Sequence, residues 1–109
     1  MKKYPKLHAF RELKSLMGEY NRIRTEERED RMVAYVTSGA PVEVLEAAGV
    51  LTFFPENYGA QCGTMGKSTP LSMVSEGAGF PMDLCTYAKT HVGAILNPDS
   101  APSGGLPKP

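Results

Sequence analysis

Apolar residues recur every three or four positions along the first quarter of the chain, between about residues 6 and 28. They are Leu7, Phe10, Leu13, Leu16, Met17, Tyr20 and Ile23. This spacing gathers them on one face of an amphipathic helix, and the charged run at residues 25–31 is typical of a solvated surface. We expect the apolar stripe to pack against the rest of the domain or against a partner subunit, because apolar surface costs about 25 cal/mol per Å² in water.

Two short runs, residues 32–36 and 50–54, are almost continuously apolar rather than alternating. Such runs are typical of strands that are covered on both faces in a parallel sheet. The segment between them starts near Pro41 and stops at Gly49, a pattern that predicts a short helix. Strand, helix and strand form a βαβ unit, so we predict an α/β fold of the Rossmann-like, doubly wound type, preceded by the long amphipathic helix. Ser38 and a loop at residues 56–63 would follow the carboxyl ends of the strands, where such sheets bind ligands.

Two further helices are expected in the second half of the chain. The first is short, at residues 71–76, because Pro70 precedes it and Gly77 follows. The second spans residues 84–96, is slightly weakened by Gly93, and has one apolar side formed by Leu84, Tyr87, Ala88, Val92, Ile95 and Leu96.

Residues 97–109 are rich in proline and glycine, which indicates a loop or a frayed tail without regular structure. A domain seldom stops in such a loop after so few strands, so we expect the chain to be the N-terminal piece of a longer protein. Three parts are predicted: a helical segment at residues 1–30, a partial α/β domain at residues 31–96, and the loop or truncated end at residues 97–109.

Charge and cysteine content exclude several classes of function. The 109 residues carry 12 basic and 12 acidic side chains, so no net field draws nucleic acid or an anionic membrane. Two cysteines are too few for a disulfide scaffold, and the chain has neither a secretory h-region nor a run of about 18 apolar residues. We therefore expect a cytoplasmic protein that binds neither nucleic acid nor membrane.

Cys85 is the strongest candidate for chemistry. Asp83 is suited to cap a helix that begins here, which would place Cys85 in the first turn. Unpaired backbone N–H groups and the positive end of the helix dipole favour a thiolate there, the form needed by a nucleophile or a metal ligand. A buried cysteine that only packs is the alternative. One cysteine cannot hold an iron–sulfur cluster alone, so any companion ligands must lie elsewhere.

The Gly-Lys-Ser run at residues 66–68 does not form a nucleotide-binding P-loop. That motif needs a glycine where this chain has Gln61, and Pro70 is expected to interrupt the helix that would cradle the phosphates. Lys67 could still meet a phosphate as an isolated charge.

His8 and His91 have no cysteine or acidic partner at metal-ligand spacing, so packing or surface roles are expected for them. Near Cys85, Tyr87 is interpreted as structural and Lys89 as solvated. Nothing in the sequence alone brings together a Ser-His-Asp or Cys-His arrangement.

Two motifs carry a family resemblance. Ser38-x-x-Pro41-x-Glu43-x-x-x-Ala47-Ala48-Gly49 follows the first strand, and Asp83-x-Cys85-x-Tyr87-x-Lys89 opens the last helix. Together with the Ala-Pro-x-Gly stretch at residues 101–104, they resemble the N-terminal domain shared by 2-hydroxyacyl-CoA dehydratases and ATP-dependent benzoyl-CoA reductases. The resemblance covers roughly residues 30–109 and is closer to the B-type subunit of benzoyl-CoA reductase.

The resemblance implies a role in reducing a CoA thioester. In this family the catalytic unit is a heterodimer of two homologous subunits, each binding a [4Fe-4S] cluster through three cysteines, of which the first matches Cys85. A separate activator hydrolyses ATP to deliver electrons at very low potential, and one-electron reduction turns the thioester into a radical anion. The resemblance also implies that Ser38 faces the thioester, whereas Cys62 matches no ligand and is interpreted as structural.

Two classes of function follow. The first is a catalytic-subunit domain of a low-potential iron–sulfur enzyme, either a dearomatising benzoyl-CoA reductase or, as an alternative, a 2-hydroxyacyl-CoA dehydratase. The second is a non-catalytic α/β module for binding or assembly, whose first helix docks a partner.

Overall fold

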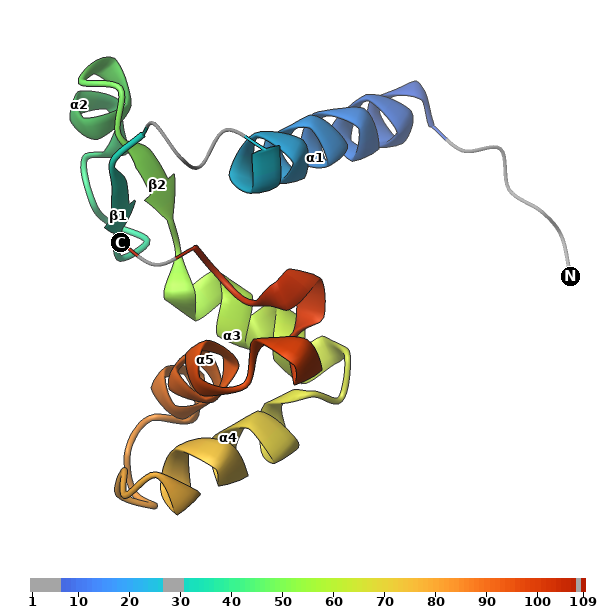
Figure 1. Cartoon of the computed structure of the whole chain (residues 1–109). Helices are drawn as coiled ribbons and strands as arrows, with labels where there is room; N and C mark the ends of the chain where they lie inside the picture. The colour runs from blue at the N-terminus through green and yellow to red at the C-terminus, as the bar shows by residue number, and fades with distance from the viewer. Residues whose placement is uncertain (1–6, 27–30, 108) are drawn as a thin grey trace, which may run out of the picture. The chain divides into compact units, whose positions relative to one another are not determined.

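The computed structural model describes residues 7–26, 31–107 and 109, and the chain divides into two compact units, Met1–Arg31 and Met32–Pro109. The first unit holds one long helix, α1 (His8–Glu26), as the apolar spacing predicted (Figure 1). The helix predicted at about residues 6–28 also includes residues 6, 27 and 28, which lie outside the described residues. The apolar side chains of the stripe from Leu7 to Tyr20 are exposed, from 46% for Tyr20 to 76% for Leu7.

The second unit begins with the predicted βαβ unit. Strands β1 (Val33–Tyr35) and β2 (Leu51–Phe53) pair in parallel, with Val33 opposite Leu51 and Tyr35 opposite Phe53. Helix α2 (Val42–Ala47) connects them. It begins just after Pro41 and stops before Gly49, whose φ of +80° is a backbone conformation that glycine adopts without strain. The prediction of adjacent parallel strands joined by a crossing helix is therefore confirmed, and the unit is of mixed α/β character.

The loop predicted at residues 56–63 is wrong, because this segment is helical. Helix α3 (Pro55–Thr64) follows β2 directly, with Pro55 in its first turn, where a missing N–H removes no helical bond. Its glycines disguise it in the sequence. At Gly59 an added Cβ would lie 3.1 Å from the Tyr87 backbone, so this glycine allows α3 and α5 to approach closely.

Helix α4 (Ser68–Gly77) is longer than the predicted 71–76, and the expectation that Pro70 interrupts it is also wrong. Pro70 is the third residue of this helix. The first amides of a helix have no intrahelical acceptor, so a proline in the first turn removes no helical hydrogen bond. Gly66 and Lys67 therefore form the turn into α4, and Ser68 is the first residue of that helix. The departure from the P-loop motif rests on Gln61 alone.

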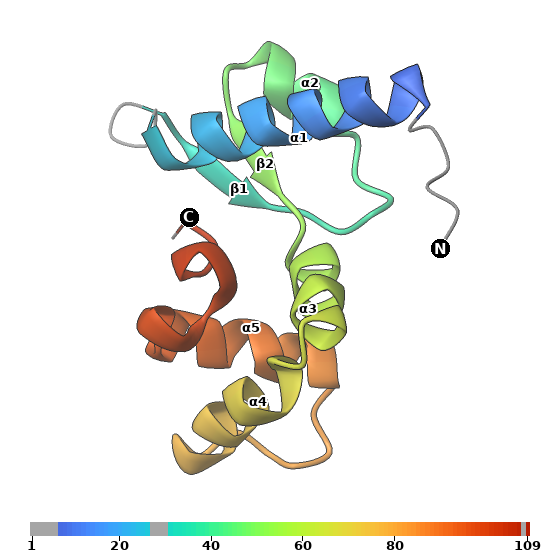
Figure 2. The same ribbon diagram turned by 90° about the vertical axis from the view of Figure 1, so that its right-hand side faces the viewer.

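Helix α5 (Thr86–Leu96) packs against α4 and α3, as Figure 2 shows. The predicted apolar side of α5 is not its most buried face, since Leu84, Ala88, Val92 and Ile95 are only half-buried. Tyr87 and Leu96 are about half exposed, at 48% and 51%. The buried residues of the helix are instead Lys89, Thr90, His91, Gly93 and Ala94. Within this face, Thr90 and Gly93 lie against Ser68 and Leu71 of α4, and their small size lets the two helices approach closely.

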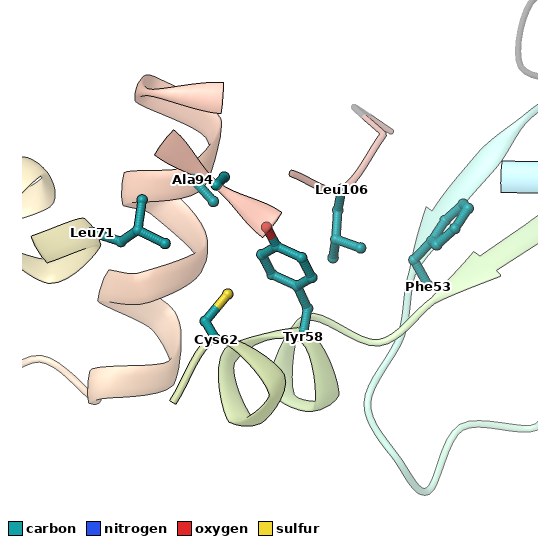
Figure 3. Close-up of a cluster of buried hydrophobic side chains, with 7 residues drawn as sticks. Phe53, Tyr58, Cys62, Leu71, Ala94 and Leu106 are labelled. Atoms are coloured by element: carbon teal, nitrogen blue, oxygen red, sulfur yellow. The ribbon is translucent and has the colours of Figure 1, made fainter. Parts of the chain in front are cut away.

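The core joins the sheet to the three helices and to the last segment of the chain. Figure 3 shows Cys62 and Tyr58 of α3 between Leu71, Ala94 and Leu106. Residues 97–107 contain two 3-10 turns, η1 (Pro98–Ser100) and η2 (Pro102–Gly104). This segment is not frayed: Ala101 and Leu106 are buried, and the Tyr58 hydroxyl donates to the Pro102 carbonyl at 2.8 Å.

Candidate functional site

Ser38 lies just beyond the carboxyl end of β1, as the sequence predicted. Its Oγ donates a hydrogen bond of 2.9 Å to Oε2 of Glu56, and both residues are exposed. Glu56 belongs to the first turn of α3, directly after β2. The carboxyl ends of the two strands thus present a paired hydroxyl and carboxylate. Sequence reasoning missed Glu56 as the partner, because the two residues meet only once the strands pair.

Cys85 is exposed, and it occupies the N-cap of α5 rather than the first turn. The predicted Asp83 cap is wrong, because residues 81–84 form a turn in which the Leu84 amide donates to the Pro81 carbonyl at 3.2 Å. Helix α5 starts one residue after Cys85, whose carbonyl accepts from the Lys89 amide at 3.0 Å. Cys85 therefore stands at the start of a helix whose first amides lack intrahelical acceptors, and its side chain makes no capping hydrogen bond.

Lys89 is buried rather than solvated, so the sequence interpretation of this residue is wrong. Its side chain is only 9% exposed. The ammonium Nζ lies 2.7 Å from Oε1 of Glu76 on α4 and 2.7 Å from the carbonyl oxygen of Met82. A charge so deeply placed needs such partners, because an unpaired buried ammonium is very costly. The pair links α4, the connecting loop and α5 one helical turn after Cys85.

The second cysteine, Cys62, has a different environment. It is fully buried in α3, not in the flexible loop that the sequence indicated. Burial raises the pKa of its thiol, an effect that a hydrogen bond with the Tyr58 side chain partly offsets. The thiol is therefore protonated and protected at neutral pH, which fits the predicted structural role.

Neither histidine lies at a cluster of metal ligands. His91 packs edge-on against Tyr35, with ring centroids 4.9 Å apart, and its two nitrogens have no hydrogen-bond partner among the described residues. Burial lowers the pKa of His91. His8 is exposed, with Nδ1 3.6 Å from Glu12. In the described part of the chain, no group of three His, Cys, Asp or Glu residues converges on a possible metal ion.

These observations define the candidate site as an exposed thiol at the start of α5, supported by the Lys89–Glu76 pair. Among the residues that the structure describes, 7–26, 31–107 and 109, no set of further metal ligands converges with this thiol. Within the same described ranges, none of the helices has the length and apolar character that a membrane span needs.

Comparisons with known proteins point in the same direction as the motifs. The chain is 32% identical over 82 residues to the (R)-2-hydroxyisocaproyl-CoA dehydratase alpha subunit of Clostridioides difficile, a match that covers 75% of this chain and 20% of that protein. It is 29% identical over 90 residues to the B subunit of benzoyl-CoA reductase from Thauera aromatica, a match that covers 82% of this chain and 21% of that protein. No family model matches the chain. The chain spans about a fifth of the length of these curated relatives.

Proposed function

Because the chain resembles the 2-hydroxyacyl-CoA dehydratases and benzoyl-CoA reductases, we propose that it is part of a catalytic subunit that acts on a CoA thioester. Cys85 would be one thiolate ligand of a [4Fe-4S] cluster. The observation that carries this proposal is the contrast between the two cysteines. Cys85 is exposed at the start of α5, within the Asp-x-Cys-x-Tyr-x-Lys motif, whereas Cys62 is enclosed in the core.

The residues present fit one corner of such a cluster. A cysteine sulfur is the usual ligand of cluster iron, and Cys85 presents a free, exposed one. The amides at the start of α5 would favour the negative charge of the bound group. When bound, the cluster would supply electron transfer at low potential. The remaining ligands would come from other segments of the subunit.

The substrate of the proposed enzyme is an aromatic acyl-CoA thioester, reduced with loss of aromaticity, and a 2-hydroxyacyl-CoA thioester is the alternative. Both relatives are named as subunits, which supports a heteromeric assembly. We assign a homologous second catalytic subunit and an ATP-hydrolysing iron–sulfur activator as partners. Ser38 would face the thioester, because its hydroxyl lies at the carboxyl end of β1 and could turn from Glu56 to donate to a carbonyl oxygen.

The two strands would belong to a larger sheet. A parallel pair connected by a helix is the repeating unit of doubly wound folds, and further strands would extend the sheet on either edge of β1 and β2. This extension gives the Rossmann-like domain expected from the sequence.

A non-catalytic binding or assembly module is the second candidate, since the described residues bring together no complete ligand set. The gene beyond Pro109 discriminates between the two. Two further cysteines in separate segments would support the enzyme, whereas a stop codon would support the module.

Cysteine substitutions in the complete subunit, purified without oxygen, test the proposal directly. Cys85→Ser is expected to lose most of the iron, acid-labile sulfide and CoA-thioester reduction of that subunit, because a hydroxyl replaces the proposed thiolate ligand. Iron, sulfide and activity are measured in parallel.

The same substitution at Cys62 is the matched control, and Cys62→Ser should retain all three properties because that thiol lies in the core. Full iron content and activity in the Cys85→Ser subunit would contradict the proposal and favour the module.

A further inference from the structure

The loop that carries Cys85 has little apolar burial to hold it. It joins α4 to α5 (Figure 1), and its residues Phe80 and Met82 are 40% and 79% exposed. Its backbone is anchored at the start, where the Phe80 amide donates to the Ser75 carbonyl at 3.1 Å. Closer to Cys85, the Leu84 amide donates within the loop itself, to Pro81. At the end of the loop, the Cys85 carbonyl accepts from the Lys89 amide at 3.0 Å. Between these backbone bonds lies Met82, whose exposed side chain does little to hold the loop in place.

Lys89 supplies an attachment at Met82. The Met82 carbonyl, three residues before Cys85, accepts from Lys89 Nζ at 2.7 Å, and Lys89 lies four residues after Cys85. The same ammonium is held at 2.7 Å by Glu76, near the end of α4. The buried Lys89 ammonium on α5 thus connects α4, through Glu76, with the loop, through the Met82 carbonyl.

We propose that Lys89 is a positioning residue for Cys85, acting through the Met82 carbonyl, and that Glu76 holds Lys89 in place. The part of this inference that concerns the cluster rests on the proposed function. The positioning itself concerns only the loop and is tested separately. The backbone bond from the Lys89 amide fixes the Cys85 carbonyl at the start of α5, whereas exposed Met82 depends on the hydrogen bond from Lys89 Nζ. Charge-assisted hydrogen bonds are stronger than neutral ones, so this second attachment restrains the approach of the loop to Cys85.

The loop is tested in the 109-residue chain by backbone ¹⁵N relaxation. Lys89→Met keeps most of the aliphatic stem and removes the donors. The order parameters of residues 82–85 are expected to fall from about 0.85, typical of rigid backbone, to about 0.6 or lower, while those of Thr90 and Ala94 stay unchanged. Lys67→Met is the matched control, because it removes the same charge from an exposed lysine. Unchanged order parameters at 82–85, or a fall spread evenly over the whole domain, would overturn the positioning role.

Two more variants keep the test decisive if Lys89→Met fails to fold. Glu76→Gln retains the Met82 acceptor but weakens the hold on the ammonium, so it should lower the order parameters of residues 82–85 relative to the unsubstituted chain. Lys89→Arg keeps the charge and donors, and should restore at least part of the rigidity. If the order parameters of residues 82–85 stay unchanged in both Glu76→Gln and Lys89→Met, the inference is contradicted.

The consequence for the cluster is measured in the complete subunit as iron content and as the electron paramagnetic resonance spectrum of the reduced centre. Lys89→Met should lose more than half of the iron, or broaden the spectrum, relative to Lys67→Met. If Cys85→Ser loses its iron but Lys89→Met keeps both iron and spectrum, the role of Lys89 toward the cluster is wrong and the proposed function stands. If Cys85→Ser keeps its iron, the proposed function fails, while the relaxation result still decides the positioning of the loop.

Discussion

Three consecutive residues of α5 bury polar side chains, and each is accommodated differently. Taken as whole residues, backbone included, Lys89, Thr90 and His91 are 7%, 0% and 8% exposed. Lys89 has its ion pair, and the Thr90 hydroxyl lies 2.6 Å from that of Ser68. The imidazole of His91 has only ring contacts among the described residues. Of the three, His91 is the one whose burial is not matched by a hydrogen bond.

We expect His91 to make the fold sensitive to acid. Burial lowers its pKa below the ordinary value of 6.5, so the unfolded chain binds a proton more readily than the folded chain does. Stability is therefore full above about pH 6.5 and decreases as the pH falls below it, by at most about 1.4 kcal/mol per pH unit for one proton. Urea unfolding at a series of pH values measures this slope.

The control is His91→Phe, which keeps an aromatic ring against Tyr35 and removes the titration. This variant should lose the part of the slope that His91 causes, whereas His8→Gln should keep it, because His8 is exposed. Identical pH dependence in His91→Phe and the unchanged chain would contradict the explanation.

At the scale of elements, the packing of α5 on α4 depends on a glycine. A Cβ at Gly93 would lie 1.9 Å from the Leu71 carbonyl oxygen, far inside van der Waals contact. The neighbouring atom is backbone, so no side-chain rotation relieves the clash. Gly93 lowers the intrinsic helix propensity of α5, as the sequence indicated, yet its main effect is to allow this approach.

Gly93→Ala is accordingly expected to destabilise the fold by about 1–3 kcal/mol, because the helices must separate to admit the methyl group. Thermal or urea unfolding measures the loss. Gly63→Ala is the matched control within α3, where no atom lies within 4 Å of the added Cβ. That variant should be stabilised by about 0.5–1 kcal/mol from helix propensity alone. Equal stability of the two variants would show that the close approach does not matter.

At the scale of the whole molecule, α1 forms a unit separate from residues 32–109. Isolated helices of this length are marginal in water, and the α1 apolar stripe has Leu13 and Met17 each 55% exposed. Packing of this stripe stays a prediction.

In the complete assembly, Leu13→Asp combined with Met17→Asp is expected to weaken folding or subunit association, because two charges would enter an apolar contact. Size-exclusion chromatography and urea unfolding measure the two effects. Ser15→Asp with Gly18→Asp adds the same charge at polar positions of the helix and should change neither. If the stripe variant behaves like this control, the expected docking is wrong.

The sequence by itself determined the parts of the fold that depend on local rules. The continuous apolar runs located the two paired strands, although β1 is only half-buried along its length, and Gly49 ends α2 because a left-handed residue is needed there. The start of the last helix was located to within two residues, since the chain before it is rich in turn-forming residues. Ser38 was placed at the end of the first strand because it stands in the turn-forming segment that follows the apolar run at residues 32–36.

Tertiary structure decided what depends on distance between helices and on partners remote in sequence. Helix α3 was hidden by its glycines, of which Gly59 is explained by the approach of Tyr87, and the buried face of α5 was decided by close packing rather than by apolar size. Lys89 looks solvated in sequence because lysine usually is, and its burial becomes tolerable only when Glu76 and the Met82 carbonyl converge on its ammonium. Pairing of Glu56 with Ser38 likewise required the strands to meet. Local patterns fix backbone conformation through sterics and periodicity, but the free energy of a buried polar group depends on neighbours that only the folded chain brings together.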